Sequence, residues 1–536
     1  MPKTLSRNTL FYGDNLAILR EHVEDESVDL IYLDPPFNSN ASYNVLFKAP
    51  DGHQSQAQIE AFDDTWHWLE PAQQAFDEVM QSGNSDAAEM LRAMRSFLKE
   101  NDMMAYLAMM AVRLLELHRV LKPTGSLYLH CDPTASHYLK VLLDAVFGKV
   151  NVRNEIIWKR TAPKGHAFSR FASTHDVILS YDKGEIARWN ASYSKYDPAY
   201  VASHYNQIEE KTGRRYQLDN TLNPNPNRPN LTYEWNGHLR VWRWTRTKMQ
   251  DLHDKGRLEY TSSGMPRYKR YFDEMLGTPI TDVWADIAPI NSQAQERLGY
   301  PTQKPLALLE RIISASSNEG DLVLDPFCGC GTTVHAAQKL DRRWIGIDVT
   351  HLAIHLIQRR LKDAFVGIRF DIQGVPKDLD GAQALALQDK YEFQKWALAM
   401  IDAQPFKGGK KGGDGGVDGF LYIKPDGKKT EKVIVSVKGG QNLNPAMVKD
   451  LTVTVHQEGA KMGVFLTLEP PTKGMVTQAA AAGFYKTDYG QFPKIQIVTI
   501  EQLFGPSNPL HLPWQDTSGF KRAKREKIET QSNLDL

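Results

Sequence analysis

The segment from Val28 to Leu33 is a short, mainly apolar run that leads directly into Asp34-Pro35-Pro36-Phe37. Such a run is typical of a buried strand in a parallel sheet. Two consecutive prolines cannot donate ladder hydrogen bonds or continue a helix, so the strand must end here. Ligands of open α/β sheets bind at the carboxyl ends of the strands. The sequence therefore predicts that Asp34 and the aromatic ring behind it lie at a ligand site.

This arrangement suits methylation of an exocyclic amine on a nucleobase. The carboxylate of Asp34 can accept one N–H of the amine, and the backbone carbonyl of Pro35 can accept the other. Proline fixes the backbone and adds no competing donor. Phe37 can stack on a base that has been flipped out of the duplex. The alternative is an ordinary exit from a strand, because Asp-Pro turns are common.

Composition limits the remaining possibilities. A chain of 536 residues predicts about three or four domains. Its 64 basic and 64 acidic residues balance, so any surface for nucleic acid must be local. Three internal cysteines exclude a disulfide framework and indicate a reducing cytoplasm. No apolar leader or membrane-length apolar run is present, so we expect neither secretion nor a membrane span.

The first 150 residues alternate between strands and helices. A strand near residue 11 is followed by Asp14, which could reach an adenine amine or cap the next helix. The polar insertion at residues 38–100, which contains Trp66 and Trp68, is expected to be a lid or a DNA-facing excursion. A helix at 103–121, a strand at 126–132 and a helix at 135–147 follow. This alternation predicts an α/β fold, a parallel sheet covered by helices.

Residues 153–276 differ from the preceding segment in composition. They contain 21 Lys or Arg, 14 Asp or Glu and 18 aromatic residues, with no long periodic segment. Cations neutralise phosphates, and rings or Arg side chains stack on or recognise bases. We therefore expect this region to contact DNA; the alternative is a loop-rich domain with a solvated basic face.

A second strand ends in Asp325 and leads into the glycine turn Pro326-Phe327-Cys328-Gly329-Cys330-Gly331-Thr332 and a helix. Small residues let the backbone approach a ligand, and the helix amino end offers free N–H groups to a carboxylate. The turn is not a P-loop, because no lysine precedes Thr332. The next strand ends in Asp348, about twenty residues on, where an acid usually binds a ribose diol. A lone CxC pair is weak evidence for metal.

Together, the two blocks resemble those of amino-group DNA methyltransferases that use S-adenosylmethionine. Thr302-Gln303-Lys304-Pro305 is similar to a further motif of that family. The catalytic block precedes the cofactor block, which resembles the permuted β group, including many adenine enzymes and modification subunits of type III restriction systems. The resemblance covers about residues 8–372 and implies a Rossmann-like parallel sheet with an inserted target-recognition region.

The resemblance also implies a role for each motif residue. Asp34, Pro35, Pro36 and Phe37 would be catalytic, and Phe37 stands where many relatives have Tyr. The implied cofactor-binding residues are Asp14, Lys304, Asp325, Phe327, Gly329, Gly331, Thr332 and Asp348. Cytosine-N4 enzymes more often begin the catalytic block with Ser, so Asp34 favours adenine N6 in double-stranded DNA, with cytosine N4 as the alternative.

The C-terminal region predicts a smaller α/β domain. A linker and a helix from Lys390 precede a glycine-rich loop, and strands 420–423 and 432–438 are expected to form a hairpin. The pattern resembles an Mrr-type restriction endonuclease of the PD-(D/E)XK kind.

In that family, acids bind a divalent metal that activates water, and a lysine steadies the charge. Glu392, Asp418 and Lys438 match, which implies a possible Mg²⁺ site. Ser436 stands where Glu or Gln is expected and coordinates metal weakly. A module that only binds DNA is the alternative.

Three hypotheses follow. The chain is an adenine methyltransferase with a nuclease-like domain, a single-chain restriction–modification enzyme with both activities, or a DNA-binding or nuclease protein whose methyltransferase half is only a recognition scaffold. A homodimer or a restriction-system partner subunit is possible. The expected segments are the catalytic half (1–152), target recognition (153–290), the cofactor half (291–372), a linker (373–387), the nuclease-like domain (388–505) and a basic tail (506–536).

Overall fold

The computed structural model describes residues 7–36, 42–48, 54–63, 67–163, 171–291, 294–298, 300, 302–406, 416–516 and 523–526. The chain divides into two compact units. One comprises Met1–Asn190 and Asp282–Leu536, and the other comprises Ala191–Thr281. Across the described residues, no helix combines the length and the apolar composition that crossing a bilayer requires.

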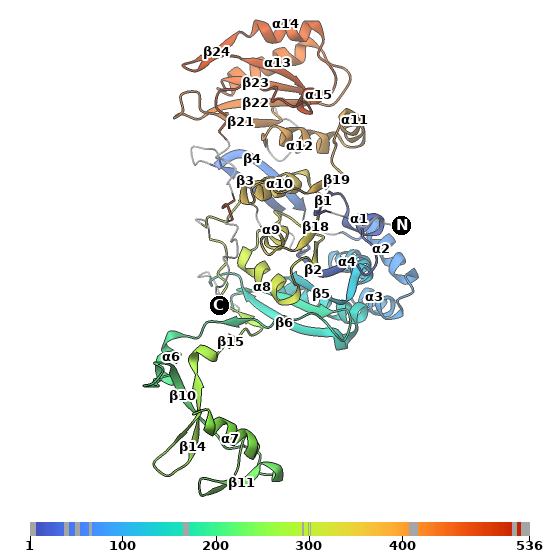
Figure 1. The fold of residues 1–536 in the computed structure, drawn as a ribbon. Helices are drawn as coiled ribbons and strands as arrows, with labels where there is room; N and C mark the ends of the chain where they lie inside the picture. The colour runs from blue at the N-terminus through green and yellow to red at the C-terminus, as the bar shows by residue number, and fades with distance from the viewer. Residues whose placement is uncertain are drawn as a thin grey trace. The chain divides into compact units, whose positions relative to one another are not determined.

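In the described part of the first unit, nine strands form one sheet in the order β16-β6-β7-β5-β2-β17-β18-β1-β19 (Figure 1). The strands are β1 (Thr9–Tyr12), β2 (Val28–Leu33), β5 (Leu121–Cys131), β6 (Val152–Lys159), β7 (His175–Asp182), β16 (Val283–Trp284), β17 (Leu322–Asp325), β18 (Arg343–Asp348) and β19 (Asp371–Gln373). Only β7 runs antiparallel to its neighbours. Strands β2, β17, β18 and β1 are mutually parallel neighbours, so their carboxyl ends share one edge.

Helices α8, α9 and α10 lie on one side of this sheet, and α1 and α4 lie on the other (Figure 1). Helix α5 buries its apolar residues in the same core cluster as α4. Their bounds are α1 (Asn15–His22), α4 (Asp102–Val120), α5 (Pro133–Leu143), α8 (Leu306–Ser316), α9 (Thr332–Lys339) and α10 (His351–Ala364). A π-helical turn (Asp144–Gly148) and a 3₁₀ turn (Lys149–Asn151) follow α5. The predicted α/β fold with a mainly parallel sheet is confirmed.

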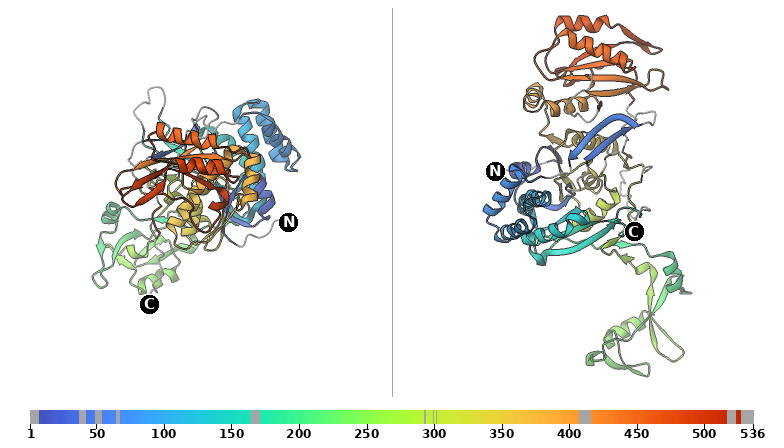
Figure 2. Two further views of the ribbon diagram at one scale, coloured as in Figure 1. Left: turned by 90° about the horizontal axis from the view of Figure 1, so that it is seen from above. Right: turned by 180° about the vertical axis from the view of Figure 1, so that it is seen from behind.

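The insertion after β2 is built from a hairpin and two helices. It contains the hairpin β3 (Ser42–Lys48) and β4 (Gln54–Asp63), then α2 (Glu70–Gln81) and α3 (Ser85–Leu98). Helices α2 and α3 lie beside α4 (Figure 2) and bury Val79 and Leu91 completely in the main core. The apolar faces of these two helices therefore cover α4, and the lid or DNA-facing interpretation of the insertion stays a prediction. Trp66 lies outside the described residues.

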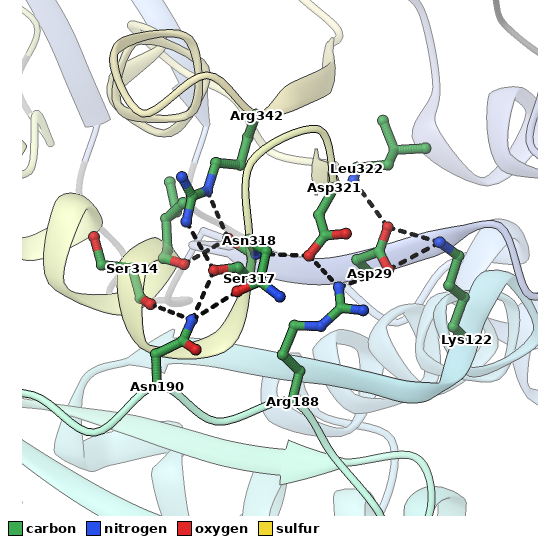
Figure 3. A network of polar contacts seen from close by, with 11 residues as sticks. Asp29, Lys122, Arg188, Asn190, Ser314, Ser317, Asn318, Asp321, Leu322 and Arg342 are labelled. Carbon is green, nitrogen blue, oxygen red and sulfur yellow. Dashed lines mark hydrogen bonds and ion pairs between the residues drawn. The ribbon is translucent and has the colours of Figure 1, made fainter. Parts of the chain in front are cut away.

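A polar network fixes the point where the chain leaves for the second unit (Figure 3). Asn190 Nδ2 donates to the carbonyls of Ser314 and Ser317 at the end of α8, both at 2.9 Å. Arg188 pairs with Asp29 and Asp321 at the amino ends of β2 and β17. These contacts lie at the edge opposite the candidate site, so they anchor the connection to the sheet without entering that site.

The second unit has its own sheet and a small core. Its elements are β8 (Tyr193–Ser194), α6 (Pro198–His204), β9 (Gln207–Ile208), β10 (Arg215–Asn220), a 3₁₀ turn (Pro229–Leu231), β11 (Thr232–Trp235), β12 (His238–Val241), α7 (Arg246–Asp254), β13 (Leu258–Tyr260), β14 (Pro266–Tyr271), a 3₁₀ turn (Phe272–Glu274) and β15 (Thr278–Pro279). Trp242 and Met249 are fully buried in it. The expected start of this region at residue 153 is corrected to Ala191, because β6 and β7 pair with β5 in the main sheet.

The C-terminal domain contains a five-stranded sheet in the order β20-β21-β22-β23-β26. Its strands are β20 (Gln404–Pro405), β21 (Gly419–Ile423), β22 (Glu431–Lys438), β23 (Met462–Thr467) and β26 (Ile495–Thr499), with a separate hairpin β24 (Phe484–Thr487) and β25 (Gly490–Pro493). Its helices are α11 (Leu379–Gln388), α12 (Lys390–Met400), α13 (Pro445–Gln457), α14 (Lys473–Ala481) and α15 (Ile500–Leu503). The predicted β21–β22 hairpin is confirmed.

The chain after residue 505 is not simply a tail. The Asp516 backbone N–H donates to the Tyr422 carbonyl at 2.8 Å, and its carboxylate pairs with Lys424 at 3.0 Å. Beyond the expected boundary at 505, the segment up to Asp516 therefore adds backbone and charge contacts to β21 and the residue after it.

Candidate active site

Three acids meet at the carboxyl edge of the main sheet. Asp34 follows β2, Asp325 ends β17 and Asp348 ends β18. Strand β17 lies between the other two in a parallel order. Parallel neighbours end at the same edge, so residues about 300 positions apart face one site. Asp14 follows β1 at the same edge.

Among the described residues, one of the two Asp34 carboxylate oxygens has a partner and the other has none. Lys304 Nζ forms an ion pair with Oδ2. Oδ1 is buried and has no hydrogen-bond partner among the described residues. A buried acceptor without a donor is costly, and such groups are rare in folded proteins. The carboxylate is therefore ready to accept a hydrogen bond from a ligand. Phe37 lies outside the described residues, so the expected stacking ring is not placed.

Lys304, expected beside the cofactor, contacts Asp34. The segment around it is held by Gln303, whose Oε1 accepts from the Leu298 N–H at 2.7 Å and whose Nε2 donates to the Glu296 carbonyl at 2.6 Å. Lys304 itself is 9% exposed. The Thr302–Pro305 motif thus places a buried cation on the acid of the other sequence block.

A buried hydrogen-bonded chain lies behind the catalytic turn. The Tyr32 hydroxyl contacts His130 Nδ1 at 2.9 Å, and His130 Nε2 contacts Asp176 Oδ2 at 3.2 Å. Burial opposes the charged form of Asp176, but the His130 hydrogen bond and nearby cations outweigh it and lower the pKa of Asp176. These three residues tie β2, β5 and β7 together. No sequence signal pointed to them, because each is an isolated polar residue in an apolar strand.

The glycine turn has a backbone that other residues rarely adopt. Gly329 and Gly331 have φ values of +53° and +76°. A Cβ on Gly331 would lie 2.7 Å from Ile357 Cγ1, so this position also requires glycine for space. Thr332 begins α9 directly after the turn. The predicted glycine turn that leads directly into a helix is therefore confirmed.

Asp348 connects this turn to the next helix. Its Oδ2 accepts from the Gly329 N–H at 2.8 Å, and its Oδ1 accepts from the Thr350 N–H at 2.9 Å. Burial raises the pKa of Asp348 to about 6 and the pKa of Asp325 to about 7, although hydrogen bonds to each carboxylate oppose the rise. Both groups therefore keep a proton to a higher pH than a free aspartic acid does.

Asp14 serves as the amino cap of α1. Its Oδ1 accepts from the Leu16 and Ala17 N–H groups, and its Oδ2 pairs with Arg113 at 2.7 Å. Arg113 also donates to Asn15, whose side chain donates to the Pro326 carbonyl at 2.9 Å. Arg113 thus links the loop after β1 to the cofactor block. The sequence feature that could have identified Arg113 is its position as a single charge inside the apolar run of α4, because a buried cation needs partners.

The C-terminal domain has a separate polar cluster around Asp418. The Gln394 amide donates to Asp418 Oδ1 at 2.6 Å, and the Val437 N–H donates to Oδ2 at 2.6 Å. Ser436 Oγ also donates to Oδ2, at 3.1 Å. Lys438 ends β22 close by in the sequence.

The expected pairing of Glu392 with Asp418 is corrected. The carboxylate of Glu392 accepts from Lys395 at 2.8 Å and from the Tyr12 hydroxyl at 3.4 Å. Residues two apart on a helix point in different directions. The α12 position that faces Asp418 is therefore Gln394, two residues further along.

A divalent metal does not fit this cluster well. Mg²⁺ prefers carboxylate oxygens and retained waters, whereas here one carboxylate is satisfied by amide, hydroxyl and backbone donors. Among the described residues, no group of three or more His, Cys, Asp or Glu side chains is placed to hold a metal. Asp414, the acid that precedes Asp418 in the glycine-rich loop, lies outside the described residues. Within the described part of the chain, the carboxylate of Asp418 accepts hydrogen bonds from the neutral donors Gln394, Ser436 and Val437.

Comparisons with known proteins agree with both parts. Residues 28–359 match the DNA methylase family of N6 and N4 enzymes, and residues 385–504 match a restriction endonuclease family. The type II methyltransferase M.EcaI of Enterobacter cloacae is 31% identical over 358 residues, covering 66% of this chain and 69% of the relative. The DNA adenine methyltransferase YhdJ of Escherichia coli K12 is 26% identical, covering 66% and 82%.

Among solved structures, the DNA modification methylase TTHA0409 of Thermus thermophilus, in complex with S-adenosyl-L-methionine, is 16% identical with a TM-score of 0.32. It covers 68% of this chain, and 99% of its own length is matched. On the family match, which spans more than half of the sequence, this chain belongs to the DNA methylase family and carries a restriction endonuclease domain at its C-terminal side.

Proposed function

We propose that this chain transfers a methyl group from S-adenosylmethionine to the N6 amine of adenine in double-stranded DNA. The observation that carries the proposal is the carboxylate of Asp34, with Oδ2 held by Lys304 and Oδ1 buried without a partner among the described residues. The acid stands at the same sheet edge as the glycine turn and Asp348, the residues that fit the cofactor. When bound, S-adenosylmethionine supplies an electrophilic methyl group.

The residues of the chain act on the target amine. Asp34 Oδ1 accepts one N–H, and the Pro35 carbonyl accepts the other, which frees the nitrogen lone pair from the ring. As the new N–C bond forms, the nitrogen becomes cationic and must lose a proton, and Asp34 Oδ1 is placed to take it. Lys304 keeps the other oxygen engaged, which fixes the orientation of the carboxylate.

The target base is tested by digesting methylated DNA to nucleosides and identifying the product by mass spectrometry. N6-methyladenosine is expected, because Asp34 opens the catalytic block and because one relative, YhdJ, is named an adenine methyltransferase. N4-methylcytosine would contradict the adenine assignment. Absence of any methylated base would contradict the proposed activity.

The second unit, Ala191–Thr281, is proposed to select the DNA sequence. Several of its cations serve the unit's own fold: Arg214 pairs with Asp273 at 2.7 Å and lies 3.8 Å from the Tyr271 ring centre. Arg228 and Arg240 are exposed and remain available for DNA. Cations that track phosphates and rings that stack would supply the contacts.

Exchanging residues 191–281 for the matching unit of a relative with another specificity is expected to change the methylated motif and keep the methylated base. Long-read modification sequencing of DNA from expressing cells reports both. An unchanged motif would show that recognition lies elsewhere in the chain.

Cofactor binding is expected to strengthen as the pH rises from about 5 to about 7.5. The raised pKa values of Asp348, about 6, and Asp325, about 7, mean that both carboxylates are protonated at the acidic end. The ammonium group of the cofactor and its ribose diol favour the ionised forms of these acids, so binding releases protons. The affinity should rise roughly tenfold per pH unit below about pH 6 for each carboxylate that must ionise.

Titration calorimetry with S-adenosylhomocysteine at several pH values and in two buffers of different ionisation enthalpy measures both the affinity and the protons released. The Asp348→Asn variant is the matched control and should show a shallower pH dependence. An affinity that is flat or falls over this range would contradict the assignment of these acids.

For the C-terminal domain, we propose DNA binding without cleavage. The observation that supports this proposal is that the carboxylate of Asp418 accepts hydrogen bonds from three neutral groups, which belong to Gln394, Ser436 and Val437. A metal would have to displace these hydrogen bonds, and among the described residues Asp418 is the one acidic side chain of this cluster. This supports a domain that retains the endonuclease fold as a DNA-binding module.

Plasmid nicking with Mg²⁺ or Mn²⁺ is expected to show no cutting of unmethylated or methylated DNA, with or without S-adenosylmethionine. The double variant Gln394→Glu, Ser436→Glu places two further carboxylates beside Asp418 and should increase metal affinity, measured by calorimetry with Mn²⁺. Metal-dependent cutting by the unaltered chain that disappears in Asp418→Ala would contradict the proposal.

A further inference from the structure

Arg360 is a buried cation on α10 that no sequence motif announced. It is 3% exposed. One guanidinium nitrogen, Nη1, donates to the Cys330 carbonyl at 3.1 Å and to Thr332 Oγ1 at 3.0 Å. These two residues flank Gly331, the residue with the constrained left-handed backbone. Arg360 therefore binds the glycine turn on both sides of Gly331.

The same helix supports the turn at further points. Ile357 lies against Gly331, close enough that a Cβ there would clash. At the other end of the turn, Asp348 accepts from the Gly329 N–H, and Asp348 directly precedes the loop into α10. The conformation of the cofactor turn is thus set by α10 and the strand end before it.

A buried guanidinium needs a compensating negative charge, because an isolated charge in the core is strongly destabilising. Burial lowers the pKa of Arg360. Its Nε donates to His335 Nδ1 at 3.1 Å, which leaves the proton of the neutral imidazole on Nε2. Burial, Arg360 and Lys339 lower the pKa of His335 to about 2, so this ring stays neutral.

Glu296 supplies negative charge near Arg360, and the C-terminal segment adds a carboxylate on the other side of His335. His335 Nε2 contacts Glu526 Oε1 at 3.1 Å, and Lys339 lies 3.6 Å from the other carboxylate oxygen. The Glu526 backbone N–H donates to the Ala364 carbonyl at the end of α10, at 3.0 Å. The contacts therefore form a chain: Glu526, His335, Arg360 and the cofactor turn. From the sequence alone, this segment is expected to be only a basic tail.

We infer that Glu526 is a positioning residue for the cofactor site: through His335 and Arg360, it holds the turn from Cys330 to Thr332 in the shape that binds S-adenosylmethionine. This inference rests on the proposed function. It makes the last described segment of the chain part of the methyltransferase rather than an appendage of the endonuclease domain. Neither Glu526 nor Arg360 is assigned contact with the reacting atoms.

The test compares full-length variants by calorimetry with S-adenosylhomocysteine and by steady-state methylation at varied S-adenosylmethionine. Arg360→Met should weaken binding and raise KM for the cofactor by about 10- to 100-fold, the usual effect of losing hydrogen bonds to a charged group. Arg360→Lys, which keeps the charge, should recover part of the loss. Because Asp34 and Lys304 are untouched, kcat should stay within about threefold.

Glu526→Gln is the decisive variant, since this side chain is 19% exposed and its loss leaves the core packed. It should raise Kd and KM by about 3- to 10-fold, as expected for one charge-assisted contact. Glu529→Gln removes the same charge three positions along the chain and is the matched control, with no change expected. Combined with Arg360→Met, Glu526→Gln should add little, because both act through one chain of contacts.

Unchanged cofactor affinity in Glu526→Gln, or an equal loss in Glu529→Gln, would overturn the inference while leaving the proposed function intact. A fall in kcat with unchanged Kd and KM would also overturn it, because that pattern belongs to the chemical step. Failure of the unaltered chain to bind S-adenosylhomocysteine would instead refute the proposed function, and this inference with it.

Discussion

Replacing Asp34 with alanine is expected to slow methyl transfer by about 10²- to 10⁴-fold, the usual contribution of a positioned acid or base. Binding of S-adenosylhomocysteine should change by less than about threefold. The reason is that the target amine and the cofactor are expected to bind different residues. Asp34 Oδ1 is a buried acceptor that no described residue engages, whereas the glycine turn and Asp348 follow the carboxyl ends of β17 and β18. Duplex methylation with labelled cofactor, together with calorimetry, measures both quantities.

A matched control is available one strand away. Asp132 follows β5 at the same edge, but its carboxylate caps α5 by accepting from the Thr134 and Ala135 N–H groups, both at 3.1 Å. Asp132→Ala should cost about 1 kcal/mol of stability, as loss of a cap does, and leave turnover nearly unchanged. Near-normal turnover by Asp34→Ala would remove Asp34 from the catalytic role.

Lys304→Met provides a second control on the same acid. It leaves Asp34 in place but removes the cation from Oδ2, so the carboxylate can rotate and its second oxygen loses its partner. A loss of turnover smaller than that of Asp34→Ala is expected, with cofactor affinity retained. A selective loss of cofactor affinity would instead support the first expectation, that Lys304 binds the cofactor.

Replacing Asp348 with alanine is expected to weaken binding of S-adenosylhomocysteine by roughly 2 to 4 kcal/mol, or about 30- to 1,000-fold. Two effects add. The ribose hydroxyls lose a charged acceptor, and the Gly329 N–H loses the carboxylate that holds the turn at 2.8 Å. Calorimetry measures the affinity, and methylation at saturating cofactor measures the chemical step, which should fall much less.

Asp14→Ala is the comparison for this variant. It also removes an acid at the end of a neighbouring strand, but the carboxylate of Asp14 is engaged with the start of α1 and with Arg113. Its main expected effect is on stability, with a smaller change in affinity. Equal losses from both variants would indicate that Asp348 acts only through the local fold. Unchanged affinity in Asp348→Ala would place the cofactor elsewhere.

The sequence alone determined the elements whose shape depends on near neighbours. Strand β2 ends at Asp34 because two prolines follow it, and the turn before α9 requires Gly329 and Gly331 because other residues rarely adopt their backbone angles. The alternation of strands and helices predicted the parallel sheet, and with it the shared edge of Asp34, Asp325 and Asp348. The β21–β22 hairpin was predictable for the same local reason.

Only the tertiary structure decided which side chains meet. Lys304 reaches Asp34 across 270 positions, and Glu526 reaches His335 across 191, pairings that depend on strand order and helix packing rather than on local sequence. The same holds where local logic failed: Gln394 rather than Glu392 faces Asp418, because the rotation of α12 is fixed by its buried face. Helices α2 and α3 pack on α4, a surface that nothing in their local sequence identifies.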